Sequence, residues 1–223
     1  ALRRRRCEMA LAKEYGLYVF DLDGTLVDTR LDIARALQKA LGEAGFPQPG
    51  LGDVTKAIGG GARKALLKLT GLKDDELDPC LLENFAAIYE QMCCDNTSVY
   101  PGAEELLKRL KERGARLAVV TMKYRTPTHR ILKHHGLFDL LDAVVSFDDI
   151  EKRKPDPDSL FMLQKRFGVP LERILMVGDS MTDLEYAKAA GVDACAVTHG
   201  YGVLEDMRAA GPRYMISGFA EML

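Results

Sequence analysis

Two aspartates separated by one residue, with glycine and threonine directly after them, are the residues of this chain best suited to chemistry. They lie in the segment V-F-D-L-D-G-T-L-V-D-T, where Asp21 and Asp23 follow the apolar run 17–20. Such a run predicts a buried strand that ends where the first aspartate begins. One carboxylate could attack phosphorus while the other donates and accepts protons. A polar turn after a core strand explains the same residues equally well, because aspartate and glycine are common in turns.

Other polar clusters downstream favour the chemical interpretation. Thr121 and Met122 follow the apolar run 117–120, where a hydroxyl and turn N–H groups could hold a phosphate oxygen. Lys154 lies in K-R-K-P-D-P, whose prolines restrict the backbone and could aim the lysine inward as a fixed positive charge. Taken alone, the threonine could simply close a strand, and the basic segment could be a solvated loop.

A last cluster, G-D-S-M-T-D, comes directly after the apolar run 174–177 and adds two more carboxylates, Asp179 and Asp183. In an open α/β sheet the carboxyl ends of the strands form the ligand site, so these side chains are expected to meet Asp21 and Asp23. Crowded carboxylates repel one another, and a hard divalent cation resolves that repulsion. Oxygen-only ligands favour Mg2+. The combination predicts phosphoryl transfer to an aspartate, with the lysine stabilising charge on the phosphoryl oxygens.

The order D-x-D-G-T, then Thr, then Lys-Pro, then G-D-x-x-x-D resembles the haloacid dehalogenase-like hydrolase superfamily over nearly the whole chain from residue 17 onward. The resemblance implies that Asp21 is the nucleophile and Asp23 the general acid and base. It implies that Thr121 and Lys154 bind the phosphate. Dehalogenases of this superfamily lack the second aspartate, and its ion pumps replace it with threonine, so Asp23 indicates a phosphatase.

The resemblance also implies the metal ligands. They are the Asp21 carboxylate, the Asp23 main-chain carbonyl and Asp179, with Asp183 supporting the site. The implied cofactor is Mg2+.

Within the superfamily the chain most resembles the phosphoglycolate phosphatases, through D-L-D-G-T-L-V-D-T, I-G-G-G-A-R, K-P-D-P and G-D-S-M-T-D. Those relatives usually carry Thr-Asn-Lys where this chain has Thr-Met-Lys, although the Met122 main-chain N–H could still bind substrate. The implied substrate is 2-phosphoglycolate. Alternatives are a pyrophosphatase, another small-molecule phosphatase, a β-phosphoglucomutase-like phosphomutase, and a phosphorylation-switched interaction module, against which Asp23 and a helical insertion argue.

The segment between residues 30 and 98 is too long for a loop and has helical patterning. We expect helices from Leu31 to near Gly45 and over 54–58, 65–69 and 77–92, which form a small cap over the strand ends. A lid of this kind excludes water during phosphoryl transfer. Gly60 and Arg63 could present N–H groups and a cation to a substrate carboxylate, or could form only a turn with a surface arginine.

After the insertion, strands and helices alternate. We expect helices over 104–113, 128–135, 159–167, 183–190 and 205–209, and strands over 117–120, 143–147, 174–177, 194–197 and 214–216. The predicted fold is α/β, a doubly wound Rossmann-like parallel sheet core with the helical cap inserted after the first strand. The predicted domains are a basic N-terminal extension (1–16), the catalytic core (17–29 and 99–223) and the cap (30–98).

Composition is ordinary for a globular enzyme of 223 residues. The net charge of -2 gives no sign of nucleic-acid binding, and no apolar stretch is long enough to span a bilayer. The five cysteines have no metal-ligand spacing and fit a reducing, cytoplasmic compartment. The arginines at 3–6 suit a solvated leading segment better than a signal peptide. The expected partner is a small phosphorylated metabolite, with the chain a monomer or homodimer.

Overall fold

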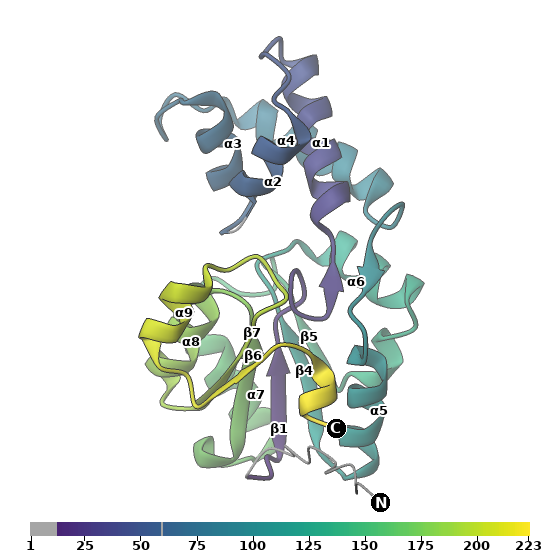
Figure 1. The fold of residues 1–223 in the computed structure, drawn as a ribbon, viewed down its shortest axis with the longest axis vertical. Coiled ribbons are helices and arrows are strands. Elements are labelled where there is room, and N and C mark those ends of the chain that lie inside the picture. Colours follow the sequence, from purple (N-terminus) through teal and green to yellow (C-terminus); the bar gives the residue numbers. More distant parts are fainter. Residues whose placement is uncertain (1–12, 59) are drawn as a thin grey trace, which may run out of the picture.

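A six-stranded sheet with all strands parallel forms the centre of the computed structural model, which describes residues 13–58 and 60–223 (Figure 1). The strand order is β5-β4-β1-β6-β7-β8. This arrangement confirms the predicted α/β fold with a parallel sheet. The strands of this sheet are β1 (Leu17–Phe20), β4 (Arg116–Val120), β5 (Ala143–Val145), β6 (Ile174–Gly178), β7 (Asp193–Val197) and β8 (Tyr214–Ile216).

Helices cover both faces of the sheet. Alternate residues of each strand point to opposite sides, and the apolar side chains on each side pack against helices. In β1, Tyr18 and Phe20 belong to the same apolar cluster as residues of α5 and α6, whereas Leu17 and Val19 belong to a second cluster with residues of α7, α8 and α9. The helices are α1 (Arg30–Glu43), α2 (Leu51–Ala57), α3 (Ala62–Thr70), α4 (Pro79–Met92), α5 (Ala103–Glu112), α6 (Arg125–His134), α7 (Asp158–Phe167), α8 (Met181–Ala190) and α9 (Leu204–Ala210), with short 3-10 helices η1 (Phe138–Leu140), η2 (Leu171–Arg173) and η3 (Phe219–Glu221).

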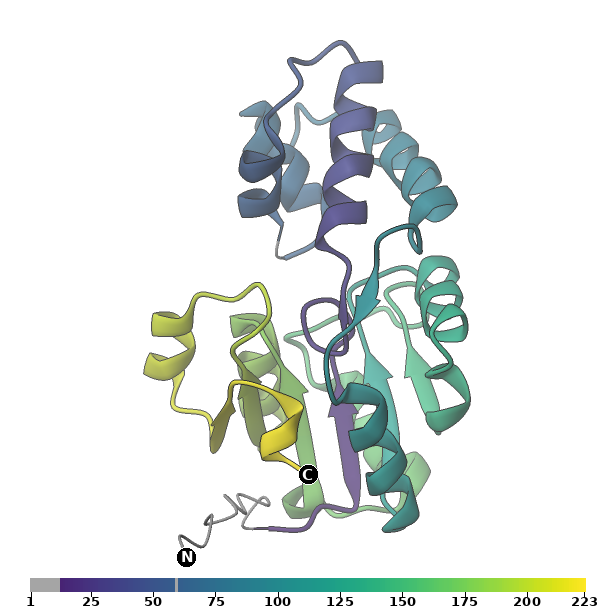
Figure 2. The ribbon, with the colours of Figure 1, turned by 45° about the vertical axis from the view of Figure 1, so that its right-hand side comes forward.

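Helices α1 to α4 lie together beyond the end of the sheet toward which the β1 arrow points (Figures 1 and 2). The chain enters and leaves them through a short antiparallel pair, β2 (Val27–Asp28) and β3 (Ser98–Val99). Asp32 of α1 links the two connecting segments, because its fully buried carboxylate accepts hydrogen bonds from the backbone and side chains of Asn96 and Thr97, which precede β3. The insertion is therefore held at its base by main-chain pairing and by one buried carboxylate.

Several element boundaries differ from the sequence expectations. Helices α2, α3 and α6 begin three residues before their expected starts, at Leu51, Ala62 and Arg125. Three other differences coincide with side-chain hydrogen bonds to the backbone. Helix α8 begins two residues before the expected start, because Ser180 and Asp183 form a reciprocal capping box. Helix α4 starts two residues late, at Pro79, because Asp78 caps it. Strand β5 ends early, at Val145, because the N–H of Ser146 donates to the Asp149 side chain.

The two-residue strands β2 and β3 have no counterpart among the elements expected from the sequence. Most of the predicted basic extension lies outside the described residues. Within 13–58 and 60–223, no helix combines the length and apolar character needed to cross a membrane.

Candidate active site

Asp21, Lys154 and Asp183 form a buried chain of charges at the carboxyl ends of the strands. The Lys154 ammonium nitrogen lies 2.7 Å from Oδ1 of Asp21 and 2.6 Å from Oδ1 of Asp183. The lysine and Asp183 side chains are 2% and 1% exposed, and that of Asp21 is 13% exposed. The N–H of Asp21 donates to the Val177 carbonyl, so the β1–β6 pairing fixes its backbone. The sheet thus brings together residues 133 positions apart in the sequence.

Asp179 lies against the same group and is anchored from two sides. The Thr25 hydroxyl donates to its Oδ1 over 2.8 Å, and the N–H of Tyr201 donates to its Oδ2 over 2.7 Å. Gly24 allows this approach, because it has a φ of 79° and a Cβ there would collide with the Asp179 carboxylate. The threonine and glycine of D-x-D-G-T therefore position a carboxylate from a different strand.

The site carries an excess of negative charge that a cation would balance. Oxygen atoms of Asp21, Asp179 and Asp183 all lie within 4.8 Å of one another. Burial, opposed by Lys154, raises the pKa of Asp21 well above its usual range. Burial and then the neighbouring Asp183 raise the pKa of Asp179 to about 7. Three carboxylates and one ammonium leave a formal charge of -2 (3 negative, 1 positive), which fits a hard divalent cation with oxygen ligands.

Asp23 turns its side chain to other partners. Its Oδ1 accepts a hydrogen bond from the Thr29 hydroxyl over 2.7 Å, and its Oδ2 lies 3.1 Å from the Lys123 ammonium nitrogen. The carboxylate is 21% exposed. Its side chain is not part of the three-carboxylate group, which agrees with a role in proton transfer. That role, and the metal contact through its main-chain carbonyl, remain predictions.

Thr121 and Met122 follow β4, the strand that pairs with β1. Thr121 is buried, and its hydroxyl accepts a hydrogen bond from the N–H of Lys123 over 3.2 Å. Its own N–H donates to Val145 and so continues the sheet. Met122 is partly buried. Both residues stand at the same edge of the sheet as Asp21, where their predicted contact with phosphate is untested.

Gly60 and Arg63 belong to the insertion and have surroundings of a different kind. Gly60 has a φ of 85° and lies two residues before α3, whereas Arg63 lies in its first turn. The Arg63 guanidinium donates to the Asp74 carboxylate and carbonyl oxygen, over 2.8 Å and 2.7 Å, on an exposed surface. Its described partners thus belong to the insertion itself, and the predicted substrate contact would require it to leave Asp74.

Four residues that hold the site together, Thr25, Thr29, Lys123 and Tyr201, have no role among the expectations from the sequence. Lys123 lies near Asp23, Thr25 donates to Asp179, and the Tyr201 hydroxyl accepts a hydrogen bond from the N–H of Thr29. A lysine two positions after the strand-ending Thr121 was a usable signal. Tyr201 offered none, because its proximity depends on the strand order.

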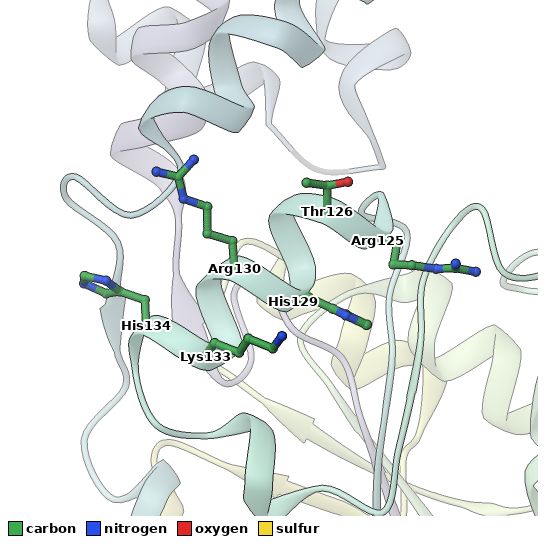
Figure 3. A pocket seen from close by; sticks show the side chains of 6 residues that line it. All are labelled: Arg125, Thr126, His129, Arg130, Lys133 and His134. Atoms are coloured by element: carbon green, nitrogen blue, oxygen red, sulfur yellow. The ribbon is translucent and has the colours of Figure 1, made fainter.

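A surface hollow of about 690 Å³ on the outer side of α6 lies apart from this site. Figure 3 shows its six side chains spreading from the helix in different directions rather than converging. Arg125 pairs with Asp149, Arg130 donates to the Glu90 carbonyl, and the Lys133 ammonium lies over the Phe138 ring; the lining residues are Arg125, Thr126, His129, Arg130, Lys133 and His134. Several positively charged side chains of this hollow are therefore already paired locally. None of the predicted site residues lines the hollow.

Comparisons with known proteins agree with this geometry. The sequence model of the family described as haloacid dehalogenase-like hydrolase matches residues 18–197. A phosphoglycolate phosphatase of Pseudomonas savastanoi pv. phaseolicola is 37% identical over 93% of this chain and 78% of its own length. One from Colwellia psychrerythraea is 34% identical over 95% and 96%. The crystal structure of a predicted phosphoglycolate phosphatase from Haemophilus somnus 129pt superimposes with a TM-score of 0.85, at 29% identity, over 95% of this chain and 97% of that one.

Proposed function

Since this chain belongs to the haloacid dehalogenase-like hydrolase family and is a phosphatase, we propose that it hydrolyses a small phosphate monoester, with 2-phosphoglycolate as the leading candidate. The observation that carries the proposal is the buried group in which the Lys154 ammonium bridges Asp21 and Asp183 beside Asp179. The choice of substrate rests on the relatives, which are named for phosphoglycolate.

In the proposed reaction a carboxylate oxygen of Asp21 attacks phosphorus, and the bond from phosphorus to the leaving oxygen breaks. Asp23 gives its proton to that oxygen, so the alcohol departs neutral and Asp21 carries the phosphoryl group. Water then attacks phosphorus and gives a proton to Asp23, and the bond to Asp21 breaks to release phosphate. Lys154 lies against Asp21, where it can stabilise the charge that develops on the phosphoryl oxygens.

Asp21, Asp179 and Asp183 supply the oxygen-rich, negatively charged surroundings that Mg2+ requires. We propose that the Asp21 and Asp179 carboxylates hold the ion together with the Asp23 main-chain carbonyl. Asp183 supports the site by holding Lys154. When bound, the ion neutralises charge on the substrate phosphate so that a carboxylate can approach it.

We propose that residues 30–98 act as a cap over residues 17–29 and 99–223. The cap would exclude water while the phosphoryl group is transferred and admit it for hydrolysis. The placement of α1 to α4 beyond the strand ends supports this division (Figure 2). Gly60 and Arg63 are the proposed contacts of the cap with the anionic tail of the substrate. A cytoplasmic setting and a small phosphorylated metabolite as partner belong to the same proposal.

A steady-state screen of phosphate esters with Mg2+ or with EDTA tests this function. We expect 2-phosphoglycolate to give the highest kcat/KM, and EDTA to abolish phosphate release. The substitution Asp21→Asn should lower kcat by at least about 10⁴-fold, because an amide cannot form the phosphorylated intermediate. Phosphate release that survives Asp21→Asn would refute the mechanism. Recovery of an isomerised ester in place of free phosphate would instead indicate a phosphomutase.

A further inference from the structure

The Asp23 carboxyl is held at both of its oxygens by groups to which the proposed mechanism gives no task. The Thr29 hydroxyl donates to Oδ1 over 2.7 Å, and the Lys123 ammonium nitrogen lies 3.1 Å from Oδ2. A carboxylate oxygen accepts more than one hydrogen bond, so both contacts leave room for a proton donor or acceptor in the substrate. The pair of contacts limits rotation of the carboxyl group.

Lys123 is itself fixed from the side of the insertion. Its side chain is 6% exposed, and its ammonium donates to the Tyr89 hydroxyl oxygen over 2.7 Å. The same ammonium lies 4.2 Å from the centroid of the Tyr89 ring, within the range of a cation–π contact. Burial raises the pKa of Tyr89 well above its usual range, so the neutral phenol oxygen accepts without adding a charge.

The Tyr89–Lys123 contact joins two parts of the fold. Tyr89 lies in α4 of the insertion, whereas Lys123 follows β4 at the edge of the sheet. A second contact in the same region joins Arg130 of α6 to the Glu90 carbonyl over 2.7 Å, and Figure 3 shows the Arg130 side chain reaching toward the insertion. Only the first of these contacts ends at a group that could take part in the reaction.

We propose that Lys123 is a positioning residue that orients the Asp23 carboxyl for proton transfer, and that Tyr89 of the insertion holds Lys123 in place. The inference rests on the proposed function, in which Asp23 protonates the leaving oxygen. A misplacement of about 1 Å in a reacting group can cost about 100-fold in rate, so the order imposed by Lys123 has a measurable consequence. Docking of α4 then orients the general acid Asp23 through Lys123, in addition to covering the site.

The dependence on the leaving group separates this role from a structural one. Departure of an alkoxide requires a proton from Asp23, whereas 4-nitrophenolate leaves without one. We therefore measure kcat/KM, which reports the steps up to departure of the alcohol, for 2-phosphoglycolate, glycerol 2-phosphate and 4-nitrophenyl phosphate. The variant is Lys123→Met, which keeps the length of the side chain and removes the charge.

We expect Lys123→Met to lower kcat/KM by about 10-fold to 100-fold for both alkyl esters and by less than about threefold for the aryl ester. A loss confined to 2-phosphoglycolate would overturn the proposal, because it would show that Lys123 binds the substrate carboxylate. Equal losses for all three esters would also overturn it, since they would indicate phosphate binding or general damage. No loss for any ester would show that Asp23 needs no support from Lys123.

The role of Tyr89 has its own variants. Tyr89→Phe keeps the ring over the ammonium and removes the oxygen acceptor, whereas Tyr89→Leu removes both contacts. We expect the selective loss for alkyl esters to be smaller in Tyr89→Phe than in Tyr89→Leu. Arg130→Ala is the matched control, because it removes the neighbouring contact between α4 and α6 without touching Lys123. A leaving-group-dependent loss in Arg130→Ala would show that docking of the insertion alone is responsible.

Circular dichroism and thermal unfolding identify variants that fail to fold. If Lys123→Met is folded but impaired, Lys123→Arg, which keeps the positive charge, should retain part of the alkyl-ester activity. Failure of the wild-type protein to hydrolyse any ester refutes the proposed function rather than this inference. If only 2-phosphoglycolate is rejected, the comparison proceeds with the other two esters.

Discussion

The two groups of predicted site residues have opposite physical surroundings. At the strand ends, Lys154 is buried between Asp21 and Asp183, and each of these charged groups has a partner from a distant segment of the chain. In the insertion, the side chains of Arg63 and Asp74 are 43% and 75% exposed and form an ion pair of a common surface type. Burying the charges of the strand-end group costs much free energy unless they are paired. Breaking the exposed pair of Arg63 and Asp74 costs little free energy.

From this difference we infer that the strand-end part of the proposed site is fixed before substrate binds. The buried carboxylates are oriented by backbone pairing, by the capping box of α8 and by hydrogen bonds such as that from Thr25 to Asp179. The side chain of Arg63 pairs with the exposed Asp74. We therefore expect the chemistry to be set by the sheet and substrate preference to be set by the insertion.

Removal of the buried Lys154 ammonium is expected to change stability and activity more than any other substitution discussed below. Lys154→Met removes the ammonium that bridges Asp21 and Asp183, and breaking a buried ion pair in this way costs about 3–5 kcal/mol. We expect the free energy of unfolding in EDTA, measured with urea, to fall by that amount, and kcat to fall with it. The matched control is Lys152→Met, whose exposed side chain pairs with Asp158 at 2.8 Å. Equal stability losses in the two variants would contradict the distinction between a buried and an exposed charge.

Binding of Mg2+ should stabilise the strand-end group and leave the insertion pair unaffected. A ligand that binds only the folded state adds about 2.7 kcal/mol at a concentration of 100 Kd, so Mg2+ should raise Tm relative to EDTA. Asp179→Asn should reduce that increase, because it removes one of the three clustered carboxylates. Asp74→Asn removes an exposed carboxylate and should keep the full increase. An equal rise of Tm with Mg2+ in the wild-type protein, Asp179→Asn and Asp74→Asn would show that the ion binds elsewhere.

The proximity of the charged groups at the strand ends could be predicted from the sequence because most of them follow an apolar run. Asp21, Thr121 and Asp179 all stand where a strand ends, and parallel strands carry their carboxyl ends to one edge of the sheet. That rule needs no knowledge of the strand order. Lys154 lies in a loop, but the prolines beside it made it recognisable.

Residues that depend on contacts between distant segments could not be predicted in the same way. The contact of Tyr89 with Lys123 depends on how α4 docks, and the hydrogen bond from Tyr201 to Asp179 depends on the neighbouring positions of β6 and β7. The pairing of Arg63 with Asp74 was not predicted either, since both side chains are exposed and the hydrophobic pattern does not specify their pairing. Hydrophobic periodicity carries no information on any of these.

The insertion pair allows a finer test of substrate recognition. If Arg63 leaves Asp74 to meet the substrate carboxylate, Arg63→Ala should raise KM for 2-phosphoglycolate by about fivefold with little change in kcat, as expected for the loss of one modest contact made throughout the reaction. Asp74→Ala frees the arginine and should leave KM unchanged or lower it. KM for glycerol 2-phosphate, which lacks the carboxylate, should not respond. A fall in kcat with unchanged KM would instead indicate that Arg63 acts on cap movement.

The smallest expected effect concerns an ion pair at the opposite end of the sheet, where Asp193 begins β7. Burial raises the pKa of this carboxyl, but hydrogen bonds from Lys13 and Tyr15 outweigh it, so the folded-state pKa lies below the unfolded value of about 3.9. The carboxylate therefore stabilises the fold above that value, and the contribution is lost as the pH falls through the folded pKa. Because the pair is partly exposed, Asp193→Asn should cost at most about 1 kcal/mol at neutral pH. Urea unfolding of both proteins should show this difference at pH 7 and its decrease as the pH falls below about 3.9, whereas a difference that grows in acid would mean that the Asp193 pKa is raised, as it is for the buried Asp179.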